Sequence, residues 1–192
     1  MAKKEMRKTI AMLLESVSVE MIKRETEIVA KKVTEAEWFK NSQRISIFIS
    51  TAGEIETDDI VLKALELKKD VFIPRFKRGQ KLMEMIKLET KAEFDNLDIS
   101  LWGIRQHHAD LSPPSYQISG PLDVVILPGV AFTKEGLRIG HGKGFYDRFL
   151  HEHKELFGAF PQTVALALNA QMVDSVPVEG HDVKLNDIYR AN

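Results

Sequence analysis

One stretch of the chain reads as a buried strand, a glycine-rich loop and a helix in direct succession. The strand is expected at Asp123–Leu127 (DVVIL), because this segment is apolar, rich in β-branched residues and closed by a Pro-Gly pair. Three alternating glycines come later, and the next helix is expected over roughly Gly144–Leu156. A buried strand that leads through a loop into a helix favours an α/β fold, in which helices cover a largely parallel sheet.

The rest of the chain alternates strand-like and helix-like segments in the same way. Further strands are expected at Arg44–Ser50, Asp70–Pro74, Lys81–Leu88, Thr163–Leu168 and, as a final edge strand, Val183–Tyr189. Helices are expected over residues 2–40, with a break near Ser16–Ser18, and over Thr57–Lys68, with Thr57 as the N-cap. Lys91–Pro121 is polar, so it predicts a long loop with short helical turns. Together these segments predict a single domain over residues 1–192, an α/β sandwich with a largely parallel sheet.

The composition excludes several classes of function. The 192 residues include no cysteine, which excludes a disulfide framework and a thiolate zinc site. The 27 basic and 28 acidic residues give a net charge of -1, so no overall basic field attracts nucleic acid or an anionic membrane. Glutamates interrupt the basic N-terminal segment, which predicts an amphipathic helix and not a signal peptide. A cytoplasmic protein without nucleic-acid or membrane partners is therefore expected.

The loop Arg138–Tyr146 (RIGHGKGFY) combines glycines, two basic side chains and the start of a helix. Glycines let backbone N–H groups approach an anion, and a helix N-terminus adds about half a positive charge. Since Arg138 and Lys143 add full charges, the loop predicts a phosphate site. It is neither a Walker A loop nor a dinucleotide-binding fingerprint, because its glycine spacing differs from both. Glycine spacing alone describes a flexible helix-entry turn equally well.

Motifs along nearly the whole chain carry a resemblance to a known family. They are AKKEMR near the start, RISIFISTAGEIET, FIPR, MEMIKLE, SLWGI, LPGVAF, GLRIGHGKGFYDRFL and, near the end, PVEGHDVKLND. In these segments the chain resembles 5-formyltetrahydrofolate cyclo-ligase, also called 5,10-methenyltetrahydrofolate synthetase. The segments FIPR and MEMIKLE look closer to the animal form. The resemblance implies a three-layer sandwich like that of the CoA-transferase and ribose-phosphate-isomerase proteins.

The resemblance also implies an ATP-dependent reaction with magnesium as cofactor. The family converts 5-formyltetrahydrofolate and ATP to 5,10-methenyltetrahydrofolate, ADP and phosphate. A formamide oxygen is a poor leaving group, so transfer of the γ-phosphoryl group to it would form an activated iminium phosphate, and N10 could then close the ring. Catalysis would consist mainly of positioning and charge stabilisation. The expected partners are ATP and a polyglutamylated folate, and the expected state is a monomer.

ATP contacts are implied in two regions. Lys3 and Arg7 form the first, and their spacing of four places both on one helix face, although spacing alone describes a solvated basic terminus more often. The second is the glycine loop, with the contacts Arg138, Ile139, Gly140, His141, Gly142, Lys143, Gly144, Phe145 and Tyr146. Lys143 and Tyr146 are the expected catalytic residues, with Lys143 the candidate for stabilising charge on the transferred phosphoryl group.

Folate contacts are implied at Ile49, Glu54, Trp102, His141, Gly142, Lys143, Gly144 and Phe145. Glu54 follows a strand end, where α/β proteins place ligands, and its carboxylate could take two hydrogen bonds from the pterin. An isolated glutamate is more often an exposed turn acid. Trp102 could stack on a flat ring, and core packing is an equal alternative. His141 stands where relatives often have tyrosine or arginine, and Phe145 replaces a common tyrosine.

Magnesium ligands are implied at Asp147 and Asp182, since carboxylate oxygens are the hard ligands that this ion prefers. Without the resemblance, Asp147 reads as a first-turn helix acid and Asp182 as an ordinary loop aspartate. His181 is a candidate supporting contact beside Asp182, and Arg75 is a weaker phosphate candidate. The remaining histidines lack the spacing of a metal site and are expected on solvated surfaces: His107, His108, His151 and His153.

Two other classes of protein remain open from the residues alone. A non-catalytic protein that binds nucleotide or folate could use the same scaffold, because fold does not determine function. A sugar-phosphate isomerase or a CoA-transferase has a related architecture. The paired residues Lys3/Arg7 and Asp147/Asp182 favour ATP and magnesium over this last class.

Overall fold

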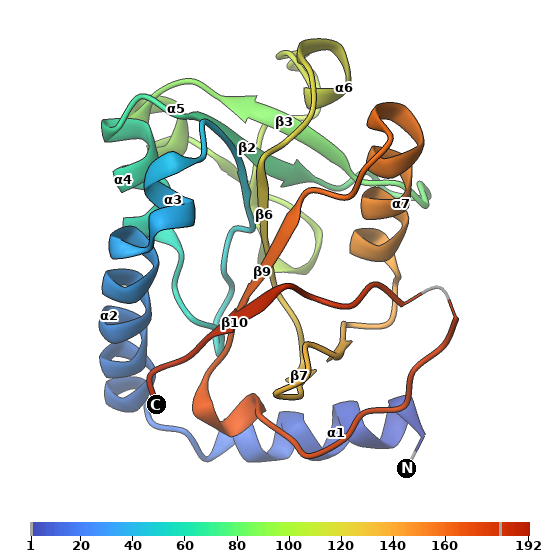
Figure 1. The fold of residues 1–192 in the computed structure, drawn as a ribbon. Helices are drawn as coiled ribbons and strands as arrows, with labels where there is room; N and C mark the ends of the chain where they lie inside the picture. The colour runs from blue at the N-terminus through green and yellow to red at the C-terminus, as the bar shows by residue number, and fades with distance from the viewer. Residues whose placement is uncertain (1, 181) are drawn as a thin grey trace.

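A six-stranded sheet forms the centre of the structure, a computed structural model that describes residues 2–180 and 182–192 (Figure 1). The strand order is β10-β9-β6-β1-β2-β3. The strands span Arg44–Ile47 (β1), Asp70–Arg75 (β2), Glu84–Leu88 (β3), Val124–Leu127 (β6), Gln162–Leu166 (β9) and Asp187–Tyr189 (β10). Neighbouring strands run parallel, apart from the antiparallel pair β2 and β3. The largely parallel sheet and the final edge strand expected from the sequence are confirmed.

Helices cover both faces of the sheet and one of its ends. The longer ones span Lys3–Glu15 (α1), Val19–Glu35 (α2), Asp58–Glu66 (α4) and Phe145–Phe157 (α7), with the short Glu37–Asn41 (α3) after α2. In Figure 1, α2, α3 and α4 lie on one face of the sheet, α7 lies on the other, and α1 crosses the end where the parallel strands finish. The three-layer sandwich that the resemblance implied is therefore confirmed.

The N-terminal helices follow their local sequence signals. The expected break separates α1 from α2, where the Ser18 hydroxyl accepts a hydrogen bond from the Met21 backbone N–H at 3.1 Å and caps α2. Val29 and Val33 lie four residues apart on α2 and are fully buried in the core. The sheet supplies the other side of this core, since all four residues of β6 are buried, as expected for a central parallel strand.

The N-terminal end of the helix expected at Thr57–Lys68 has the predicted N-cap residue but not the expected capping contact. Thr57 occupies the N-cap position of α4, but its side chain makes no capping hydrogen bond. The Thr57 hydroxyl instead donates to the Phe48 carbonyl oxygen at 2.8 Å and accepts from the Ser50 backbone N–H at 3.1 Å. Thr57 therefore holds the loop that follows β1, because that loop has no strand partner for these backbone groups.

Short elements fill the long connections. The expected loop over residues 91–121 contains short helical turns, as predicted, and also a small hairpin: Lys91–Asp95 (α5), Asp98–Ile99 (β4), Leu101–Gly103 (η1), Arg105–Gln106 (β5) and Tyr116–Ser119 (α6). A second hairpin precedes the glycine loop, and a 3₁₀ turn follows β9: Ala131–Phe132 (β7), Arg138–Ile139 (β8) and Asn169–Gln171 (η2).

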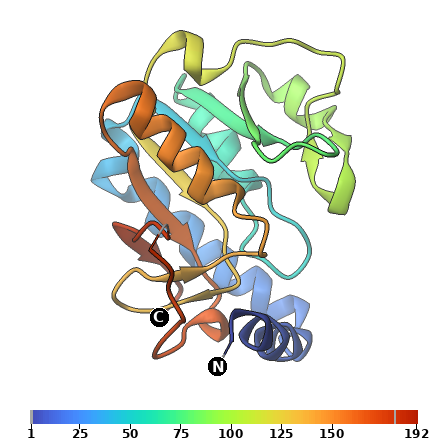
Figure 2. The ribbon, with the colours of Figure 1, turned by 90° about the vertical axis from the view of Figure 1, so that its right-hand side faces the viewer.

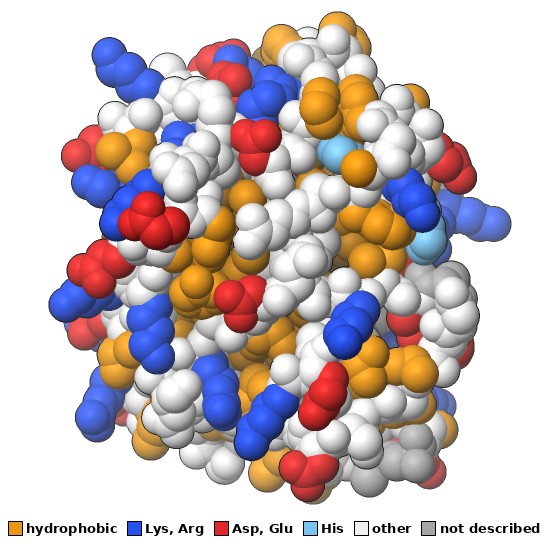
Figure 3. Space-filling view, in the orientation of Figure 1, with side chains coloured by type: hydrophobic (Ala, Val, Ile, Leu, Met, Phe, Trp, Pro, Cys, Tyr) orange, Lys and Arg blue, Asp and Glu red, His pale blue; other side chains and the backbone are white. Residues whose placement is uncertain are grey.

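The surface matches the balanced charge of the chain. Basic and acidic side chains are interspersed over the face shown in Figure 3, without a continuous patch of one sign. Across the described residues, no helix is both long enough and apolar enough to span a membrane.

The order of the strands creates a crevice at one end of the sheet. The chain runs from β1 to β2 and β3 on one side and then returns to β6 on the other side of β1. The loops that follow β1 and β6 therefore leave the sheet in opposite directions. In α/β proteins, such a point outside the carboxyl ends of the strands is where ligands bind.

Candidate active site

A cavity of about 350 Å³ opens at this point, within the size range of ligand pockets. Figure 2 shows the loop after β1 (cyan) beside the loop that leads into α7 (orange), and residues of both loops line the cavity. Most of the expected site residues are in its wall: Ile49, Glu54, Trp102, Arg138, Gly140, His141, Lys143, Gly144, Phe145, Tyr146 and Asp147.

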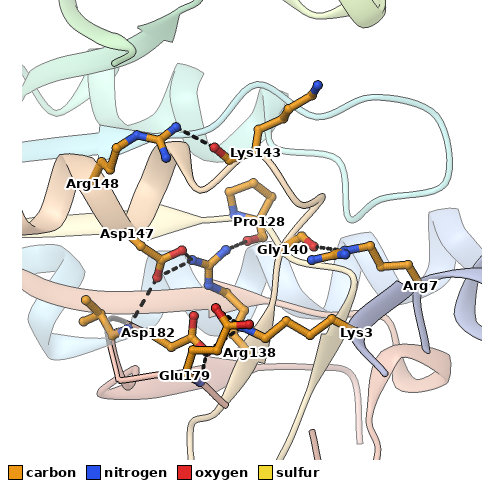
Figure 4. A network of polar contacts seen from close by, with 11 residues as sticks. Lys3, Arg7, Pro128, Arg138, Gly140, Lys143, Asp147, Arg148, Glu179 and Asp182 are labelled. Atoms are coloured by element: carbon orange, nitrogen blue, oxygen red, sulfur yellow. Dashed lines mark hydrogen bonds and ion pairs between the residues drawn. The ribbon is translucent and has the colours of Figure 1, made fainter. Parts of the chain in front are cut away.

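Arg138 and Asp147 form an ion pair that is largely buried in the cavity wall. Nη2 of Arg138 lies 3.1 Å from both carboxylate oxygens of Asp147, and the two side chains are only 5% and 17% exposed. Nη1 of Arg138 also donates to the Pro128 carbonyl oxygen at 3.3 Å, while its Nε has no hydrogen-bond partner among the described residues. Arg138 thus connects the end of β6 to the first turn of α7 (Figure 4).

The first turns of α1 reach the same region from the other end of the sequence. Lys3 Nζ lies 2.8 Å from Asp182 Oδ2 and 3.5 Å from Glu179 Oε2. Arg7 Nε donates to the Gly140 carbonyl oxygen at 2.8 Å, so both basic residues face the site, as their spacing predicted (Figure 4). The charged cluster consists of Lys3, Arg7, Arg138, Asp147 and Asp182.

The two proposed metal ligands lie close to each other. Asp147 Oδ1 accepts a hydrogen bond from the Val183 backbone N–H at 3.3 Å, which brings the residue after Asp182 against α7. Asp182 Oδ2 accepts from the Glu179 backbone N–H at 2.7 Å. One hydrogen bond within the loop that carries Asp182 and one hydrogen bond to α7 therefore hold this loop in place.

Arginine side chains lie close to two glycines of the loop, and the backbone conformation favours glycine at a third position. A Cβ on Gly140 would lie 2.8 Å from Arg138 Nη1, and one on Gly142 would lie 3.2 Å from the Arg7 guanidinium carbon. Gly144 has a φ of 64°, which disfavours other residues, and caps α7. Glycine therefore lets both arginines approach the loop backbone.

Aromatic side chains form the opposite part of the wall. The Phe76 ring centroid lies 5.1 Å from that of Phe145 and 5.9 Å from that of Trp102, both in edge-to-face arrangements. Trp102 is 57% exposed and adopts a φ of 66°, a conformation that costs a residue with a Cβ about 1–2 kcal/mol. Phe76, Trp102 and Phe145 are the aromatic cluster. Trp102 is not a core residue, and its exposed ring leaves the alternative of stacking on a ligand.

Polar residues between the two clusters complete the wall. Glu54 Oε2 accepts hydrogen bonds from the Thr51 backbone N–H at 2.8 Å and from the Thr51 hydroxyl at 3.1 Å. Its other oxygen, Oε1, lies 3.6 Å from Nε2 of His141. Burial raises the pKa of the Tyr146 phenol far above its ordinary value, and the negative charge of Glu54 adds to the shift. Tyr146 is therefore a neutral hydrogen-bond donor at physiological pH.

Comparison with known proteins identifies the family. The family model of 5-formyltetrahydrofolate cyclo-ligase matches residues 1–190. This chain belongs to the 5-formyltetrahydrofolate cyclo-ligase family. The family is one of enzymes.

Relatives of the cyclo-ligase family match over almost the full chain. A probable 5-formyltetrahydrofolate cyclo-ligase of Caenorhabditis elegans is 44% identical over 97% of this chain and 91% of its own length. The 5-formyltetrahydrofolate cyclo-ligase of Mus musculus is 34% identical over 97% of this chain and 92% of its own. Both are animal proteins, in line with the segments that look closer to the animal form.

A solved structure of a cyclo-ligase relative supports the fold. The 5,10-methenyltetrahydrofolate synthetase of Aquifex aeolicus superposes with a TM-score of 0.79 at 24% identity, over 98% of this chain and 89% of the other. At this identity the likeness shows the shared fold.

Some of the residues expected for a cyclo-ligase site lie outside the cavity wall. Lys3, Arg7, Gly142 and Asp182 surround the wall without lining it. The Ile139 side chain is buried in a small cluster with Ile10 of α1, and Ile139 does not line the cavity. Lys143 lines the cavity, but its ammonium group points away from the Arg138–Asp147 pair (Figure 4).

The cavity also includes residues that the sequence did not single out: Phe48, Thr51, Pro74, Phe76, Ile104 and Pro128. Phe48, Phe76 and Pro128 directly follow β1, β2 and β6, so the rule that α/β ligand sites lie at strand ends could have found these three. Phe76 is the most informative omission, because it connects Trp102 to Phe145.

Two of the histidines expected on solvated surfaces are buried. His153 accepts a hydrogen bond from the Leu122 backbone N–H at 3.0 Å, its other ring nitrogen lies 2.9 Å from the Ala159 carbonyl oxygen, and burial lowers its pKa. His107 is also buried and desolvation lowers its pKa. The prediction was wrong for both, because backbone groups of other segments contact each ring: those of Leu122 and Ala159 for His153, and that of Lys87 for His107. His108 and His151 are exposed, as expected.

The weaker phosphate candidate Arg75 is occupied elsewhere. Its guanidinium is buried, donates to Glu84 Oε2 at 2.7 Å and also binds the carbonyl oxygens of His108 and Leu111. Arg75 therefore fastens the loop before α6 to β2 and does not line the cavity. His181, expected beside Asp182, lies outside the described residues.

Proposed function

We propose that this chain converts 5-formyltetrahydrofolate and ATP to 5,10-methenyltetrahydrofolate, ADP and phosphate. The observation that carries the proposal is the family match over residues 1–190, together with a cavity whose wall contains most of the residues expected for this reaction. One side of that cavity suits phosphate groups and the other suits a flat apolar ring.

The charged cluster would receive the nucleotide. Lys3 and Arg7 project from one face of α1 toward the glycine loop, and their cationic groups would contact the phosphates. The backbone N–H groups before α7 and the helix N-terminus would add further positive potential. Lys143 could swing toward the transferred phosphoryl group, because its side chain is exposed on a glycine-rich loop.

Asp147 and Asp182 fit a magnesium ion that is held partly by substrate phosphates. The described residues contain no group of three acidic or histidine side chains that could form a closed metal cage. Two carboxylates from neighbouring segments are what magnesium commonly takes from a protein in nucleotide sites. When bound, the ion would neutralise developing charge on the phosphates.

The folate would occupy the aromatic side of the cavity. Trp102 and Phe145 offer faces for the pterin or the aminobenzoyl ring, and Ile49 adds apolar surface from the loop after β1. Glu54 would accept hydrogen bonds from the amino-pyrimidine edge, since Thr51 already fixes its orientation. Tyr146 would donate a hydrogen bond into the cavity, because its phenol stays protonated.

The proposed reaction has two steps. The formyl oxygen attacks the γ-phosphorus, ADP leaves, and the oxygen becomes part of a good leaving group. N10 then forms a bond to the formyl carbon and loses its proton, and the carbon–oxygen bond breaks as phosphate departs. The protein would contribute position and charge, which are the main sources of catalysis in phosphoryl transfer.

The test is an assay of the purified full chain. Protein, ATP, magnesium and 5-formyltetrahydrofolate are mixed, and the ultraviolet absorbance of the methenyl product is followed, with a control lacking ATP. Product that forms only with ATP is the expected result. Binding of both ligands without product would instead indicate a binding protein, and product without ATP would contradict the phosphorylation step. Preference for a polyglutamylated folate, the monomeric state and the cytoplasmic location remain predictions.

A further inference from the structure

Arg148 connects two segments that contribute to the cavity wall. It lies in the first turn of α7, directly after Asp147, and is half-buried. Its Nη2 donates to the Lys143 carbonyl oxygen in the glycine loop (Figure 4), and its Nε donates to the Lys81 carbonyl oxygen at 2.8 Å. Lys81 belongs to the connection between β2 and β3, which begins with Phe76 of the aromatic cluster. One guanidinium therefore joins the glycine loop to the connection that follows β2.

Two consecutive residues of α7 hold both ends of the glycine loop. Asp147 pairs with Arg138 at the start of the loop, while Arg148 binds the carbonyl of Lys143 near its end. A Cβ on Gly144 would lie 2.8 Å from Nη1 of Arg148. The guanidinium therefore packs directly against the loop backbone.

Lys143 depends on such a contact because a glycine lies on either side of it. Gly142 and Gly144 have φ values of 91° and 64°. Since glycine has the largest choice of backbone conformations, a loop rich in it adopts one conformation only where contacts select that conformation. The bond from Arg148 fixes the Lys143 carbonyl, while the Lys143 side chain stays exposed.

We infer that Arg148 is a positioning residue for phosphoryl transfer and that it acts through Lys143. The inference rests on the proposed function, in which the Lys143 ammonium group meets the transferred phosphoryl group. With the carbonyl fixed, only side-chain rotations of Lys143 remain to be ordered in the transition state. Without the bond from Arg148, the loop backbone must be ordered as well, and a smaller fraction of molecules holds the ammonium group within reach.

The test is a double-mutant cycle on kcat, with the KM of both substrates measured beside it. Arg148→Met should lower kcat about tenfold and change either KM less than about twofold, because the misplaced group acts in the transition state. In the Lys143→Ala background, the same change should lower kcat less than about twofold, since the group that Arg148 positions is gone.

Two further variants separate positioning from charge. Arg148→Lys keeps the positive charge but should lower kcat nearly as far as Arg148→Met, because the planar fork of arginine can bind two carbonyl oxygens and an ammonium group is a single point of charge. Lys154→Met removes an exposed charge from the same helix and should leave kcat unchanged.

Hydrogen exchange tests the inference without turnover. The backbone amides of residues 142–145 should exchange faster in Arg148→Met than in wild type, because the loop opens more often. In Lys154→Met these amides should exchange at the wild-type rate.

Several results would overturn the inference while wild type still makes product. They are a kcat of Arg148→Met within about twofold of wild type, an equal loss of kcat with and without Lys143, an effect on KM alone, full activity in Arg148→Lys, or unchanged exchange in the loop. An Arg148→Met variant that no longer folds would assign the guanidinium to the fold and overturn it too. Absence of product from wild type would overturn the proposed function and this inference together.

Discussion

The charged and aromatic clusters hold their side chains in place by different means. In the charged cluster, Lys3 and Arg138 are already paired with Asp182 and Asp147 through contacts of 2.8 and 3.1 Å. In the aromatic cluster, Trp102 meets Phe76 edge to face and Phe145 at a tilt of 51°, and it remains mostly exposed. A nucleotide with its metal must therefore exchange partners with existing ion pairs, whereas a flat ring can add to a surface that is already open.

This difference predicts where substitutions act. Side chains of the charged cluster contribute both to folding and to nucleotide binding, because a largely buried ion that loses its partner is costly. Side chains of the aromatic cluster contribute mainly to ligand binding. The effects can be separated by measuring the free energy of unfolding beside the KM of each substrate.

The largest effect is expected for Asp147→Ala. It removes the carboxylate from a guanidinium that is 5% exposed, so the free energy of unfolding should fall by about 3 kcal/mol, and kcat should fall as well. Urea unfolding followed by circular dichroism measures the loss. Asp95→Ala breaks an exposed ion pair with Lys91 and should cost less than about 0.5 kcal/mol. Equal costs for the two variants would show that Arg138 gains little from Asp147.

A smaller and more selective effect is expected for Lys3→Met. It retains most of the side-chain length but removes the charge beside Asp182, so the KM for ATP should rise about tenfold, which corresponds to about 1.4 kcal/mol. The KM for 5-formyltetrahydrofolate should not change. Lys8→Met removes an exposed charge from the same helix and serves as the control. A matching rise in Lys8→Met would indicate a general electrostatic effect of α1.

Trp102→Gly should affect the other substrate. Loss of the ring should raise the KM for 5-formyltetrahydrofolate roughly fivefold, or about 1 kcal/mol, and leave the KM for ATP unchanged. The free energy of unfolding should stay within about 1 kcal/mol of wild type, because glycine adopts a φ of 66° without strain. Trp102→Phe should recover most of the folate affinity. A large loss of stability in Trp102→Gly would assign the ring to the core instead.

The smallest effect concerns His153, which belongs to neither cluster, and it is expected in the pH dependence of the free energy of unfolding. Because burial lowers the pKa of His153, the unfolded state binds a proton at higher pH than the folded state. The stabilisation is therefore present above the ordinary value near 6.5 and is lost as pH falls below it. The decline, measured by urea unfolding, should be shallower in His153→Gln and unchanged in His151→Gln. Identical slopes in all three proteins would rule out the contribution.

The sequence predicted those features that depend on local patterns. The strand–loop–helix unit, the break before α2 and the edge strand β10 follow from apolar periodicity, a serine cap and strand propensity, and all three are present. The face shared by Lys3 and Arg7 follows from helix geometry alone.

Partners that lie far apart in the chain could not be predicted in this way. Lys3 and Asp182 are separated by 179 residues, and the pattern around either one does not specify the other. Burial of His153 and capture of the Thr57 hydroxyl by the loop after β1 likewise depend on which segments the fold brings together. The resemblance supplied candidate residues for the site, and the structure shows that most of the acids and bases among them are paired with each other.

We propose that the charged side of the cavity delivers a phosphoryl group to a folate held on the aromatic side. This transfer can be tested by following the oxygen atom of the formyl group. Wild-type protein is given ATP and 5-formyltetrahydrofolate labelled with ¹⁸O in the formyl group, and the released phosphate is analysed by mass spectrometry. One labelled oxygen is expected in each phosphate released with methenyl product. Unlabelled phosphate, with the label released into water, would contradict it.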